Sequence, residues 1–132
     1  MLHQPHHPRR YILWLPPVLW AVVIFFLSAT SAPPVPPLDI PAYDKIGHMA
    51  VYGFLGFLIT HALRRAHHLS VPRAALIAIL LVAAYGASDE WHQSFVPDRD
   101  ASLADWFADI LGGSLAQLIH WYDARPSRKT TR

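Results

Sequence analysis

The chain has 132 residues, of which 53% are hydrophobic and only 15% are charged, whereas a soluble globular domain carries about 25% charged residues. This shortage of charge argues against an ordinary soluble protein, because much of the surface must face something other than water. There is no cysteine, which excludes disulfides and thiolate metal sites. The formal net charge of +2 is divided into separate blocks and forms no basic stripe, which argues against nucleic acid as a partner.

The first predicted element is an uncharged segment at residues 11–29, close to the ~20 residues needed to cross the hydrocarbon core of a bilayer. A cleaved signal peptide is the alternative, since Arg9 and Arg10 precede the segment. However, the apolar part of a signal peptide is usually about 7–15 residues long, and Pro33 follows too closely to suit a cleavage site. We therefore expect an uncleaved membrane span.

Three further apolar segments follow, at residues 46–63, 71–87 and 103–122. The last of them carries Asp105 and Asp109. A helix on the surface of a soluble protein shows a charged face about half its circumference wide, and none of these segments shows one. The sequence therefore predicts an all-α fold, an integral membrane bundle of four transmembrane helices that forms one domain over residues 11–122.

The distribution of positive charge predicts the orientation of these spans. Nine of the 11 Lys and Arg residues lie in three regions, namely the tail at residues 1–10, the connection at 64–73 and the basic tail at 123–132. Four spans place all three regions on one side, and positive charge favours the cytoplasmic side. We therefore expect both termini in the cytoplasm, and a multi-pass protein of the bacterial inner membrane.

Two connections are predicted on the opposite, outer side. Residues 30–43 are rich in proline, which predicts an extended, semi-rigid connection. Residues 88–102 are polar and are predicted to form a long loop.

Ionisable residues gather at the outer ends of the last three segments, at the spacing of one helix face. Asp44 and His48 are four residues apart, as are Asp105 and Asp109, and such pairs share a face. With their neighbours they form a candidate polar site, in which no catalytic role is assigned to a single residue: Asp44, Lys45, His48, Asp89, Glu90, Gln93, Arg99, Asp105 and Asp109.

Asp109 is the most informative of these residues, because it lies about 9 Å below the outer end of its segment at 1.5 Å per residue. A charge at that depth costs several kcal/mol unless it faces a cavity or a partner. We therefore expect its side chain to point into the bundle, toward His48 or Lys45. The alternative is that these polar residues only hold the helices together, at roughly 0.6–2 kcal/mol per contact. Their number at one end favours a functional site.

A metal site is a second alternative. His48 and His92, together with Asp89, Glu90 or Asp109, offer the ligands of a His/carboxylate site for zinc or another divalent cation. The sequence has no HExxH motif or comparable ligand pattern, and the acids pair equally well with the lysine and arginine of the same cluster. No cofactor is therefore predicted.

At these residues the sequence resembles the VanZ-like family of membrane proteins. Three motifs in order carry the resemblance: Asp44-Lys45-x-x-His48 with Tyr52, Asp89-Glu90-x-x-Gln93 with Phe95, Pro97 and Arg99, and Asp105-x-x-x-Asp109-x-x-Gly112. The resemblance covers about residues 43–116, and the family often has Asn at the position of Asp109. The family is named for an accessory protein linked to teicoplanin resistance, and the resemblance implies no particular catalytic mechanism.

Three functions follow from these patterns, in order of preference. The first is an enzyme or binding protein for an envelope lipid or a cell-wall precursor, with Lys45 and Arg99 holding a phosphate or carboxylate headgroup. The second is a non-catalytic membrane module that assembles with or stabilises envelope machinery. The third is a proton-coupled carrier, with Asp109 and His48 in the relay. The lipid bilayer is the expected partner in each case, and the oligomeric state stays open.

Overall fold

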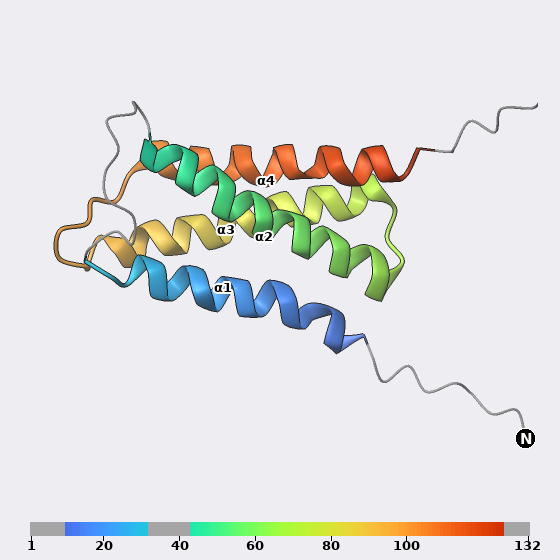
Figure 1. The fold of residues 1–132 in the computed structure, drawn as a ribbon, viewed down its shortest axis with the longest axis horizontal. Helices are drawn as coiled ribbons and strands as arrows, with labels where there is room; N and C mark the ends of the chain where they lie inside the picture. Colours follow the sequence, from blue (N-terminus) through green and yellow to red (C-terminus); the bar gives the residue numbers. More distant parts are fainter. Residues whose placement is uncertain (1–9, 32–42, 126–132) are drawn as a thin grey trace, which may run out of the picture.

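The computed structural model describes residues 10–31 and 43–125. These residues form a 3-10 turn, η1 (Tyr11–Trp14), and four α-helices, α1 (Leu15–Ser28), α2 (Tyr43–His67), α3 (Val71–Gln93) and α4 (Leu103–Asp123). Successive helices run in opposite directions along one long axis (Figure 1). The prediction of an all-α fold is confirmed. The proline-rich connection and most of both tails lie outside the described residues.

The second and third helices are longer than the apolar segments that predicted them. α2 begins at Tyr43 rather than at residue 46, and α3 continues to Gln93 rather than ending at residue 87. The loop predicted over residues 88–102 is therefore shorter, at residues 94–102. Hydropathy marks where apolar sequence stops, whereas the backbone hydrogen bonds of a helix continue into polar sequence. As a result, most of the candidate site lies on helices.

Three stretches of helix are long and apolar enough to cross a membrane: Tyr11–Ser28, α2 and α3. The chain is thus a multi-pass membrane protein. α4 is not among the three because polar residues interrupt its apolar sequence, and it buries these residues: Asp105, Asp109, Gln117 and His120.

The outward face of α4 is apolar. Its exposed side chains include Leu103, Phe107, Leu111, Leu115, Leu118 and Ile119. This arrangement, polar inside and apolar outside, is the reverse of a helix in a water-soluble protein. Large apolar side chains are exposed on α1, α2 and α3 as well, which suits a surface solvated by lipid.

α2 and α4 form the most extensive helix pair, and glycines let their backbones meet. A Cβ at Gly112 would lie 2.8 Å from the Cα of Met49, and a Cβ at Gly53 would lie 3.2 Å from the carbonyl oxygen of Gly112. One turn further, a Cβ at Gly56 would lie 3.0 Å from the Cα of Gly113. These four glycines therefore allow a close approach of the two helices.

The apolar core lies between the first three helices and consists of Ile24, Tyr52, Leu55, Ile59, Leu63, Ala74, Ala78 and Val82. Polar bonds join α2 to α4 beside it. The hydroxyl of Thr60 donates to Oε1 of Gln117 at 2.6 Å in the buried interior.

The start of α1 and the end of α4 lie at the same end of the bundle, on the right in Figure 1. The start of α2, the end of α3 and the start of α4 lie together at the opposite end. The fold therefore brings the three polar helix ends predicted from the sequence to one place.

Candidate functional site

The polar cluster is formed by side chains from three helix ends: Asp44, Lys45 and His48 of α2, Asp89, Glu90 and Gln93 of α3, and Asp105 and Asp109 of α4. Five of the eight are buried: Asp89, Glu90, Gln93, Asp105 and Asp109. The structure thus brings together every candidate residue except Arg99, which lies nearby in the loop before α4.

Lys45 connects the first turns of α2 and α4. Its ammonium nitrogen lies 2.7 Å from a carboxylate oxygen of Asp44 and 2.8 Å from one of Asp105. The side chain of Asp105 is only 12% exposed, so the ammonium group compensates a largely buried negative charge.

His48 and Asp109 meet deeper in the bundle. Nδ1 of His48 lies 2.9 Å from Oδ1 of Asp109, whose side chain is completely buried. Of the two partners predicted for Asp109, the structure shows His48. The imidazole ring is stacked parallel to the ring of Tyr52, with centroids 6.2 Å apart. Within the described parts of the chain, the Tyr52 hydroxyl and Oδ2 of Asp109 are buried without a hydrogen-bond partner.

The two acids of α3 are held by hydrogen bonds rather than by cations. Oδ2 of Asp89 accepts from the hydroxyl of Ser28 at 2.8 Å and from the amide of Gln93 at 3.0 Å. Oε2 of Glu90 accepts from the backbone N–H of Ser102 at 2.6 Å. Ser28 was missed in the sequence, where it is only one of several small residues at the end of the first segment.

Arg99 fixes the loop before α4 to the end of α1. Its Nε and Nη2 donate to the backbone carbonyl oxygens of Thr30 and Leu27, both at 3.1 Å. A guanidinium group suits carbonyls at this position, because the last turn of a helix carries partial negative charge. The expected pairing of Arg99 with a carboxylate is thus replaced by pairing with backbone oxygens.

His92, considered as a metal ligand, does not belong to the group of possible ligands that the described residues bring together. Its ring is stacked on Phe25 of α1, with centroids 4.7 Å apart. The structure instead gathers His48, Glu90 and Asp109, with one ligand atom of each within 4.8 Å of the others.

A groove of about 560 Å³ lies beside the cluster, between α1 and α2. One part of its lining is apolar, with Ile24, Leu27, Ile46, Ala50 and Val51. The other part is polar, with Ser28, His48, Asp89, Gln93 and Arg99. Ile46 and Ala50 are exposed, so the apolar part is open to the surroundings of the bundle.

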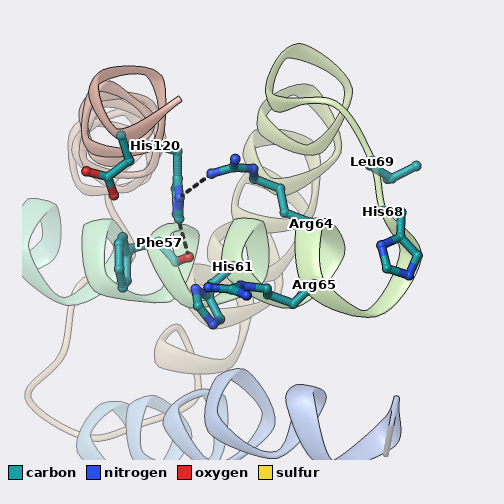
Figure 2. A pocket seen from close by; sticks show the side chains of 8 residues that line it. Phe57, His61, Arg64, Arg65, His68, Leu69 and His120 are labelled. Carbon is teal, nitrogen blue, oxygen red and sulfur yellow. Dashed lines mark hydrogen bonds between the residues drawn. The ribbon is translucent and has the colours of Figure 1, made fainter. Parts of the chain in front are cut away.

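A second hollow lies at the opposite end of the bundle, and Figure 2 shows its lining. Nδ1 of His120 lies 3.4 Å from the guanidinium of Arg64, and its Nε2 lies 3.1 Å from the carbonyl oxygen of Phe57. The other lining residues are His61, Arg65, His68, Leu69 and Asp123. This end is therefore basic, whereas the polar cluster is acidic.

Comparison with known proteins identifies the family. The family model described as VanZ/LLP1 matches residues 11–122. A protein of Schizosaccharomyces pombe, described as uncharacterized, is 32% identical over 104 residues, which make up 78% of this chain and 62% of the relative. The chain thus spans less than two thirds of that relative's length. No solved structure matches the present chain. Because the family model includes all four helices, the chain belongs to the VanZ/LLP1 family.

Proposed function

We propose that the protein binds an amphiphilic molecule, an envelope lipid or a lipid-linked cell-wall precursor. The observation that carries this proposal is the groove between α1 and α2, which joins an apolar wall to the polar cluster. Its volume of about 560 Å³ falls within the roughly 300–1,000 Å³ of typical ligand sites. An acyl or prenyl chain would lie against Ile24, Leu27 and Ile46, with its headgroup toward His48 and Arg99.

The polar side of the groove suits a headgroup that carries phosphate or carboxylate. Arg99 uses two of its nitrogens for backbone carbonyls within the described residues, and a guanidinium group offers five N–H donors in all. Among the described residues Arg99 forms no ion pair with a carboxylate, so its remaining donors suit an anionic oxygen.

The same geometry supports chemistry on the bound headgroup. His48 lines the groove and is oriented by a fully buried carboxylate, that of Asp109. A histidine held in this way is a common general base. We therefore propose binding of the amphiphile first, and chemical conversion of its headgroup as an additional activity.

Binding of the amphiphile in the groove is tested with a substitution that fills the groove. Ala50 is exposed and lines the groove, whereas Ala84 is exposed on α3 outside it. The purified wild type, Ala50→Phe and the matched control Ala84→Phe are incubated in detergent with a total lipid extract of a bacterial envelope. Native mass spectrometry then counts the retained lipids. We expect the wild type and Ala84→Phe to retain one lipid class and Ala50→Phe to lose it. Equal retention by all three proteins would contradict the proposal.

For the membrane arrangement, the proposal is four spans in a bacterial inner membrane, with both termini in the cytoplasm. The apolar outer face of α4 supports a fourth span, and the basic residues around the second hollow support a cytoplasmic position for that end. Alkaline phosphatase and green fluorescent protein are fused in turn to the C-terminus. Fluorescence without phosphatase activity is expected, and the reverse result would overturn the orientation.

A further inference from the structure

The buried acids of the polar cluster outnumber the cations that reach them. Lys45 pairs with Asp44 and Asp105, and Arg99 donates to backbone carbonyls. Within residues 10–31 and 43–125, the remaining buried acids, Asp89, Glu90 and Asp109, have no lysine or arginine partner, and the histidine beside Asp109, His48, is charged only when it is protonated. Uncompensated negative charge in a low-dielectric interior costs several kcal/mol per charge, so the arrangement favours an additional positive charge.

Two carboxylate oxygens in this region are buried and have no partner. Oδ2 of Asp109 and Oε1 of Glu90 accept no hydrogen bond in the described structure. The residues are 0% and 8% exposed, respectively. A buried unpaired acceptor is expensive, and a bound cation would supply the missing partner of both oxygens.

His48 completes that donor set. It comes from α2, Glu90 from α3 and Asp109 from α4, and one ligand atom of each lies within 4.8 Å of the others. The second carboxylate oxygen of Glu90 is fixed by the backbone N–H of Ser102 at 2.6 Å. Such an outer hydrogen bond orients a metal ligand, because it holds the free oxygen in place.

We propose that His48, Glu90 and Asp109 hold a divalent transition-metal cation such as zinc. An imidazole nitrogen with two carboxylate oxygens favours a transition metal over magnesium or calcium, which prefer oxygen ligands alone. Three protein ligands leave a coordination position for an exchangeable group. Since His48 also lines the groove, a headgroup oxygen of the amphiphile would take that position, and this last step rests on the proposed function. With the metal bound, His48 acts as a ligand and not as a general base.

The test uses the full chain purified in detergent and stripped with a chelator. Zinc binding is measured by titration calorimetry, and cobalt(II) serves as a spectroscopic probe whose visible absorption reports nitrogen and oxygen ligands. We expect one zinc ion per chain, bound more tightly than micromolar, and a cobalt(II) spectrum that zinc abolishes. A wild-type protein that binds neither metal would overturn the proposal, whatever the variants do.

Matched variants locate the site. Asp109→Asn and Asp123→Asn make the same change on α4, and His48→Gln and His61→Gln make the same change on α2. Loss of a direct ligand should weaken binding by more than the about 10–100-fold that outer hydrogen bonds contribute. We expect this loss for Asp109→Asn, His48→Gln and Glu90→Gln, and unchanged binding for Asp123→Asn and His61→Gln. If one of the three buried ligand variants fails to fold, the other two still test the site. Equal affinity in each pair would place the metal elsewhere and overturn the assignment.

The cation and the amphiphile are separable by experiment. Zinc binding by a protein that retains no lipid would contradict the proposed function and leave the cation site supported. Retained lipid in a chelated protein that does not bind zinc would overturn the cation site and leave the proposed function supported.

Discussion

Replacing Gly112 with alanine perturbs the closest contact in the bundle. A Cβ at this position would lie 2.8 Å from the Cα and from the carbonyl carbon of Met49, and closer still to its carbonyl oxygen. Carbon atoms in favourable contact are about 3.5 Å apart, so the two carbon contacts alone require α2 and α4 to separate locally by about 0.7 Å, and the shorter contact with the oxygen makes this a minimum. Because the obstacle is backbone, no side-chain rotation relieves it. We expect a destabilisation at the upper end of the range for overpacking, about 3 kcal/mol.

The same separation acts on the polar cluster. Nδ1 of His48 and Oδ1 of Asp109 are 2.9 Å apart across these two helices. An additional 0.7 Å gives about 3.6 Å, which is too long for a hydrogen bond. Gly112→Ala should therefore lose zinc binding together with stability.

Gly47→Ala is the control, because nothing lies within 4 Å of a Cβ at Gly47 near the start of α2. There alanine should be neutral or stabilising by up to about 1 kcal/mol, since glycine disfavours helix. The free energy of unfolding of both variants and the wild type is measured by titration with a denaturing detergent. If the two variants agree within about 0.5 kcal/mol, the close backbone contact inferred between α2 and α4 is wrong.

Three further predictions concern polar contacts between helices. Lys45→Met leaves the largely buried Asp105 without its cation and should lower the melting temperature at neutral pH. Adding Asp105→Asn to the same chain should largely restore the melting temperature, and additive losses in the double variant would refute the pairing. Thr60→Val removes the donor to Gln117 at almost constant volume and should cost about 0.6–2 kcal/mol in detergent unfolding, and an unchanged stability would show that the bond contributes nothing. Trp106→Phe removes a 2.8 Å bond to a backbone carbonyl of α3 and should cost about 1 kcal/mol, whereas a gain in stability would contradict this reading.

The sequence alone determined the class of protein. Long uncharged segments identify membrane spans because a bilayer requires apolar length whatever the tertiary structure. Helical spacing also determined which residues share a face, as for Asp44 and His48. These inferences depend only on residues close together in the chain, and for that reason the all-α fold and the family were predictable.

Helix ends were less predictable from sequence. The apolar segment at residues 71–87 stops where hydropathy falls, but α3 continues to Gln93. Averaged over the length of a span, α4 is less apolar than the three stretches that are apolar enough to cross a membrane, because it buries Asp105 and Asp109 while exposing Phe107 and Leu111. An average over sequence does not distinguish an inward face from an outward one.

The partners of the site residues were decided by the tertiary structure. His48 and Asp109 are 61 residues apart in the sequence, as are Ser28 and Asp89. Nothing in the local pattern selects Ser28 for Asp89, or a backbone carbonyl rather than a carboxylate for Arg99. Which partner each side chain meets depends on the spacing and the register of the packed helices. Between α2 and α4 the glycine contacts set both, and these contacts exist only in the folded bundle.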